Sequence, residues 1–137
     1  KLEPANIARF IEGDRTVKER MLVGSNMGGQ LKHKWEQMKY AVMNDPRSGP
    51  ECFVDEALHA QVQKTASKRF GYRGVIALAT GDGNAKGRAT FPDCVMLALE
   101  NDWHVELYSW HASTSQVYLN LLREYSSVFS IRYFDEM

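Results

Sequence analysis

An aspartate between two glycines is the feature of this sequence most suited to chemistry. Asp82 lies in the segment Thr80-Gly81-Asp82-Gly83-Asn84, at the end of the apolar run 75–80. If that run is a strand of a parallel sheet, Asp82 lies beyond the carboxyl end, where α/β sheets bind ligands. The glycines let the backbone turn sharply, and the oxygens of Asp82 and Asn84 suit Mg²⁺ or Mn²⁺. Because Asp-Gly and Gly-Asn are also common turn pairs, a plain turn is the alternative interpretation.

Two further aspartates occur near the starts of predicted helices. Asp55 opens the longest predicted helix, 53–70, and Asp93 lies near the start of a helix predicted over 91–101. Acidic residues are also favoured at helix starts by the helix dipole, and that purely structural explanation applies to both. If the start of the long helix adjoins the strand end, Asp55 and Asp82 are expected to share a metal, with Asn84 and Asp93 assisting. Such a metal activates water and stabilises the leaving oxygen of a phosphodiester.

Basic and aromatic residues occur at the same expected edge of the sheet. Lys86 and Arg88 lie in the glycine loop, where they are placed to hold RNA phosphate. Trp110 and His111 follow another predicted strand, where they are placed to stack on a base, although such aromatics more often cover the core. The glycine loop lacks the Lys-Ser/Thr pair of a P-loop and the dinucleotide-binding fingerprint, and the sequence shows no Ser/His/Asp nucleophile arrangement.

The elements that must position these residues alternate between helix and strand. The alternation is typical of an α/β protein with a parallel sheet and helices on both faces, a three-layer sandwich. The apolar run 75–80 is expected to be buried on both faces, and the alternating run 128–134 to be an edge strand. Because such domains usually begin with a strand and this sequence begins with a helix, we expect a first strand to lie outside it. Helices are predicted over 4–12, 31–40, 53–70, 91–101 and 115–125, and strands over 18–23, 41–43, 75–80, 104–110 and 128–134.

Length and composition are those of one globular domain, 1–137, of ordinary hydrophobic content. The 17 basic residues balance the 17 acidic ones, so any RNA-binding surface must be local. No apolar run approaches the roughly 20 residues of a membrane span, so no membrane partner is expected. Cys52 and Cys94 lie outside any CxxC motif, which predicts reduced thiols in an intracellular protein. The compartment, cytoplasm or an organelle such as the mitochondrion, stays open.

Several segments, in this order and spacing, resemble the NYN domain of the PIN-like ribonuclease superfamily. The resemblance covers nearly the whole chain, and its motifs are specific as a set but weak singly. They are Met21–Ser25, Phe53–His59, Ala77–Asn84, Gly87–Pro92 and Trp103–Trp110.

The resemblance implies a PIN-like fold and a ribonuclease that depends on Mg²⁺ or Mn²⁺. Asp55 matches the family's acidic residue on the mid-chain helix, and Asp82 matches the one after the central strand. Asn84 stands where many members carry a second aspartate. The aspartate that ends the family's first strand has no counterpart in this sequence.

Two alternatives therefore stand beside a metal-dependent endoribonuclease. One is an inactive PIN-like domain that binds RNA or other proteins within a ribonucleoprotein complex. The other is a phosphate-binding protein of flavodoxin-like shape. That second alternative needs a phosphate-cradling loop after its first strand, and this sequence does not show such a loop.

Overall fold

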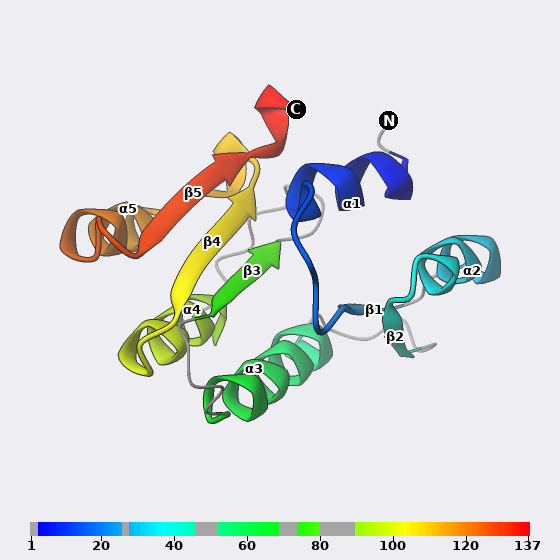
Figure 1. The fold of residues 1–137 in the computed structure, drawn as a ribbon, viewed down its shortest axis with the longest axis horizontal. Helices are drawn as coiled ribbons and strands as arrows, with labels where there is room; N and C mark the ends of the chain where they lie inside the picture. Colours follow the sequence, from blue (N-terminus) through cyan, green and yellow to red (C-terminus); the bar gives the residue numbers. More distant parts are fainter. Residues whose placement is uncertain (1–2, 26–27, 46–51, 69–73, 80–89) are drawn as a thin grey trace. The chain divides into compact units, whose positions relative to one another are not determined.

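The structure is a computed structural model of the whole chain, and its elements are drawn in Figure 1. It divides into two compact units, Lys1–Ala57 and Leu58–Met137, which are described separately. The residues that the structure describes are 3–25, 28–45, 52–68, 74–79 and 90–137.

The first unit is built around a pair of parallel strands. Helix α1 (Pro4–Glu12) has proline at its first position and ends at Gly13, whose φ is +59°. Strands β1 (Met21–Ser25) and β2 (Ala41–Asp45) pair in parallel, and helix α2 (Gly29–Gln37) connects them. The three elements thus form a βαβ unit, as the sequence pattern predicts.

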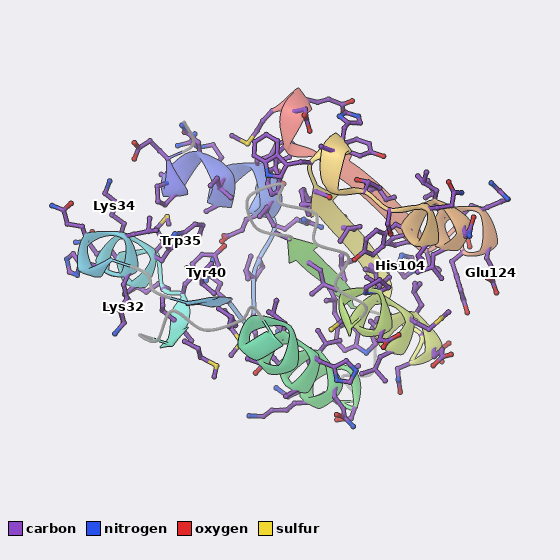
Figure 2. All side chains as sticks on the ribbon, turned by 180° about the vertical axis from the view of Figure 1, so that it is seen from behind. Lys32, Lys34, Trp35, Tyr40, His104 and Glu124 are labelled. Atoms are coloured by element: carbon purple, nitrogen blue, oxygen red, sulfur yellow. The ribbon has the colours of Figure 1, made fainter. Side chains whose placement is uncertain are left out.

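A polar cluster ties α1 to the strand starts in this unit. The Arg20 guanidinium donates two hydrogen bonds of 3.1 Å to the Glu12 carboxylate, and the Tyr40 hydroxyl donates one of 2.5 Å. The Tyr40 ring packs edge-on against the buried Trp35, with centroids 4.9 Å apart; both are labelled in Figure 2. Arg20 and Tyr40 each immediately precede a strand, so this cluster sets where β1 and β2 begin relative to α1.

The second unit contains a three-stranded sheet in which all strands run in the same direction (Figure 1). The strands are β3 (Val75–Ala79), β4 (His104–Ser109) and β5 (Phe129–Tyr133), in that spatial order. Helix α4 (Thr90–Glu100) connects β3 to β4, and α5 (Gln116–Glu124) connects β4 to β5. Helix α3 (Cys52–Ala66), which belongs to this unit from Leu58 onward, precedes β3. Short 3-10 turns η1 (His111–Ser113) and η2 (Phe134–Glu136) follow β4 and β5.

The core of the second unit lies on one face of this sheet. Alternate strand residues such as Leu78, Leu107 and Phe129 pack against α4, α5 and the end of α3 in a single apolar cluster. Two right-handed crossovers that advance the same way across a sheet place both helices on one face. The sheet order β3-β4-β5 is of this kind, so the predicted three-layer arrangement is not confirmed within this unit.

The element types agree with the sequence predictions, and their ends differ by a few residues. Helix α1 has the predicted bounds, whereas β1 begins at Met21 rather than at residue 18 and continues to Ser25. Strand β5 is an edge strand, as predicted. The expectation that β3 is buried on both faces is wrong for the sheet as described. Its neighbour β4 is the central strand, and Val75 of β3 is 48% exposed.

Candidate functional site

The carboxyl ends of the three strands of the second unit meet at one edge of the sheet. Ala79, the last residue of β3, pairs with Tyr108, and Ser109, the last residue of β4, pairs with Tyr133, which ends β5. Parallel α/β sheets bind ligands at this edge. The segment that follows β3 in the sequence begins with Thr80 and contains Asp82. The candidate site is therefore this edge, which we call the carboxyl edge.

Four of the predicted site residues belong to segment 80–89, which lies outside the described residues. They are the predicted metal ligands Asp82 and Asn84 and the predicted phosphate-binding residues Lys86 and Arg88. Each remains a prediction, and only the strand that leads into the segment is described.

The two remaining predicted acidic residues lie in the first turns of helices. The backbone of Asp55 is helical, near the start of α3, and its side chain is outside the described part. Asp93 lies in the first turn of α4 and is exposed, a position where the helix dipole favours a carboxylate. Among the described residues, no three His, Cys, Asp or Glu side chains are grouped to hold a metal ion.

Trp110 packs against the first residue of η2. Its ring centroid lies 5.4 Å from that of Phe134, at an interplanar angle of 45°, and Phe134 is buried. Trp110 is half-buried as a result. This contact fits the alternative given above, in which the aromatic residue covers the core, and leaves part of the ring accessible.

His111 is held between β5 and η2. Its ring is stacked on Tyr133, with centroids 3.7 Å apart and an interplanar angle of 11°. Its Nδ1 lies 3.3 Å from the Asp135 carboxylate and its Nε2 lies 3.7 Å from that of Glu136. The side chain is still 52% exposed. A ring stacked on one face and about half exposed is suited to stacking, but two carboxylates at its edge make the surroundings acidic.

The backbone N–H of His111 also donates a 2.9 Å hydrogen bond to Asp135 Oδ1. This backbone hydrogen bond is the main reason that the pKa of Asp135 lies below its ordinary value. Asp135 is therefore ionised at neutral pH and anchors η2 to the segment that follows β4.

Hydroxyl groups fix the backbone on which Trp110 and His111 lie. Ser109 is fully buried, and its hydroxyl donates to the carbonyl oxygen of Trp110 at 3.2 Å. Thr114 Oγ1 donates to the same carbonyl at 2.9 Å and lies 3.3 Å from Ser109 Oγ. These hydrogen bonds shape the loop that carries Trp110 and His111.

Sequence reasoning missed the two acidic partners of His111. Asp135 lies 24 residues further along the chain, beyond a strand predicted to continue to residue 134. The signal available was the parallel topology, because residues that follow neighbouring parallel strands emerge at one edge. The same reasoning that placed His111 at the carboxyl edge would have placed Asp135 and Glu136 there.

The first unit contains an ionisable cluster formed by Glu12, Arg20 and Tyr40, which we call the Glu12 cluster. Burial opposes ionisation of Glu12, but hydrogen bonds from Arg20 and Tyr40, with the charge of Arg20, outweigh it and lower the pKa of Glu12. Burial, followed by the hydrogen bond to Glu12, raises the pKa of Tyr40. The cluster lies at the amino ends of β1 and β2, opposite to the strand ends where ligands bind, so we interpret it as structural.

Comparison with models of protein families, with curated proteins and with solved structures finds no match to this chain. The resemblance to NYN domains therefore stays a prediction. In the described part of the chain, no helix has the length and apolar character needed to span a membrane.

Proposed function

We propose that the chain is a metal-dependent endoribonuclease-type domain that acts on RNA phosphodiesters at the carboxyl edge. The supporting observation is the pairing of Ala79 with Tyr108. Because of this register, the glycine loop that contains Asp82 and the segment that contains Trp110 and His111 start from adjacent points of one sheet edge.

In this proposal Asp55 and Asp82 are the catalytic carboxylates and hold Mg²⁺ or Mn²⁺, with Asn84 and Asp93 assisting. The metal supplies activation of water and stabilisation of the leaving oxygen. The four roles come from residue type and sequence position, and the resemblance to NYN domains supports the first two. Asp93 has the least support, because its exposed position is explained by the helix dipole alone.

The same proposal assigns RNA binding to Lys86, Arg88, Trp110 and His111. The lysine and arginine neutralise phosphate, and the exposed part of the His111 ring is offered to a base. Trp110 contributes at most the part of its ring that Phe134 does not cover.

The test measures how fast the wild-type chain and the Asp82→Asn variant cleave single-stranded RNA in the presence of Mn²⁺. We expect the substitution to abolish cleavage, because an amide replaces the charged metal ligand. The matched control is Asp14→Asn, since Asp14 is exposed in the turn after α1 and undergoes the same chemical change. Cleavage by Asp82→Asn at the wild-type rate contradicts the assignment.

A second candidate is a non-catalytic module that binds RNA or proteins in a ribonucleoprotein complex. It is favoured by the neutral Asn84 and by the carboxylates of Asp135 and Glu136 beside His111. Those charges repel phosphate and suit a basic protein segment, so they favour the protein-binding form of this candidate. Titration with Mn²⁺ separates the candidates, because the enzyme must bind the ion, whereas the module binds its partner equally well in the presence of a chelator.

A further inference from the structure

Trp103 lies where α3, β3, α4 and β4 of the second unit come together. It is 8% exposed and belongs to the apolar core cluster. Its indole Nε1–H donates a 3.1 Å hydrogen bond to the carbonyl oxygen of Ala66, the last residue of α3. Its backbone N–H donates to Ala98 of α4 at 3.1 Å. The side chain thus reaches from the start of β4 to the end of α3.

The opposite side of the indole rests on Gly74, the residue before β3. A methyl group added at Gly74 would lie 2.8 Å from Cε3 and 3.0 Å from Cη2 of the indole, and closer still to Cζ3. Separations this short do not occur between real side chains, so only glycine allows the ring to lie there. The carbonyl of Gly74 also accepts the backbone N–H of His104 at 3.0 Å, which fixes the backbone on which the ring rests.

One side chain therefore ties the end of α3 to the beginning of β3. We propose that Trp103 is a positioning residue, a latch that sets the alignment of α3 with β3. The inference rests on the proposed function for its consequence, because Asp82, a proposed catalytic residue, follows the end of β3 by three residues.

The consequence for chemistry follows from the position of Gly74 directly before β3. A shift of Gly74 displaces the strand whose last residue, Ala79, precedes Asp82 by three positions. Displacement of a catalytic group by about 1 Å can cost roughly 100-fold in rate. Trp103 thereby influences the reaction without touching the substrate.

Two variants loosen the latch in different ways. Trp103→Phe removes the indole N–H and its hydrogen bond to Ala66. Gly74→Ala adds a methyl group that displaces the indole ring. Phe129→Leu is the control, because Phe129 is also buried in the same core but belongs to β5, at the far side of the sheet.

The first measurement is amide hydrogen exchange, which does not depend on RNA. Both latch variants are expected to accelerate exchange in the last turns of α3, residues 62–66. The increase in rate there is expected to be at least about tenfold larger than the increase in α5. Phe129→Leu is expected to change the two helices alike. If Trp103 only fills the core, the latch variants will accelerate amide exchange equally in α3 and α5. That result contradicts the proposed latch.

The second measurement is the kinetics of RNA cleavage with Mn²⁺, at a temperature where all variants are folded. Misalignment acts on the chemical step, so the latch variants are expected to lose at least about tenfold in kcat with KM within about threefold of wild type. Local loosening of α3 without a loss of kcat refutes the positioning role. If the wild-type chain does not cleave RNA, the proposed function fails, and hydrogen exchange still decides whether Trp103 aligns the helix.

Discussion

Removing the Tyr40 hydroxyl tests how the Glu12 cluster stabilises the first unit. In Tyr40→Phe the ring remains, so its edge-on contact with Trp35 is kept. Only the 2.5 Å hydrogen bond to the Glu12 carboxylate is lost. Hydrogen bonds to charged groups contribute about 1.5–3 kcal/mol. The Glu12 side chain is 19% exposed and keeps its two bonds from Arg20, so we expect a loss of about 2 kcal/mol.

The pH dependence of this loss follows from the direction of the pKa shift. The folded-state pKa of Glu12 is lowered, so its stabilising effect is present above the unfolded-state pKa, about 4.3. The effect disappears as the pH falls through the lower, folded-state pKa. Tyr40→Phe is therefore expected to differ most from wild type near neutral pH and to approach it in acid, where Glu12 is protonated in both proteins.

Urea unfolding followed by circular dichroism at several pH values measures both expectations. Tyr133→Phe is the matched control, because its ring also stacks on a neighbour, His111, and it is expected to change stability by less than about 0.5 kcal/mol. An equal loss of stability at neutral and acid pH refutes the reasoning, since it means that the hydroxyl does not act through the charged form of Glu12.

Three further outcomes are expected. Gly13→Ala places a side chain at φ +59°, ψ −134°, and thermal unfolding is expected to show a loss of about 1–3 kcal/mol in the free energy of unfolding. The control Gly29→Ala is expected to lose no stability, because the φ of Gly29 lies outside the left-handed region and the space around it is open. Equal effects of the two substitutions contradict the backbone argument. In an absorbance titration the step that Tyr40→Phe removes is expected above the ordinary tyrosine pKa of about 10, because burial and the hydrogen bond to Glu12 raise the pKa of Tyr40. The stabilising effect of Tyr40 is lost as the pH rises above about 10, and removal of a step at or below that pH contradicts the raised pKa. His111→Ala is expected to leave the pKa of Asp135 mostly lowered in a carbon-13 NMR titration, because the backbone N–H of residue 111 is the main cause; full restoration assigns the effect to the ring instead.

Local patterns in the sequence identify the elements but not their neighbours. The apolar run at 75–79 correctly predicts a strand, yet apolarity alone cannot say which strand lies beside it, and β4 rather than β3 is central. The same limit applies to Gly74. Nothing in its local sequence shows that an indole 29 residues further along the chain rests on it, because that contact is made only when the strands pair.

For the candidate site, position relative to strand ends is predictable and side-chain partners are not. His111 lies at the carboxyl edge, as predicted from the end of its strand. Its contacts with Asp135 and Glu136 depend on the turn that follows β5, which the sequence pattern does not reveal. The Glu12 cluster likewise joins residues from α1 and from two strand starts that are spread over 28 positions.

The measurement that tests the central proposal most directly is RNA cleavage by the wild-type chain with Mn²⁺, compared with Asp82→Asn and Asp14→Asn. The proposal predicts cleavage that stops on addition of a chelator, is lost in Asp82→Asn and persists in Asp14→Asn. Cleavage that continues unchanged in Asp82→Asn contradicts it, and so does a wild-type chain that neither binds Mn²⁺ nor cleaves RNA.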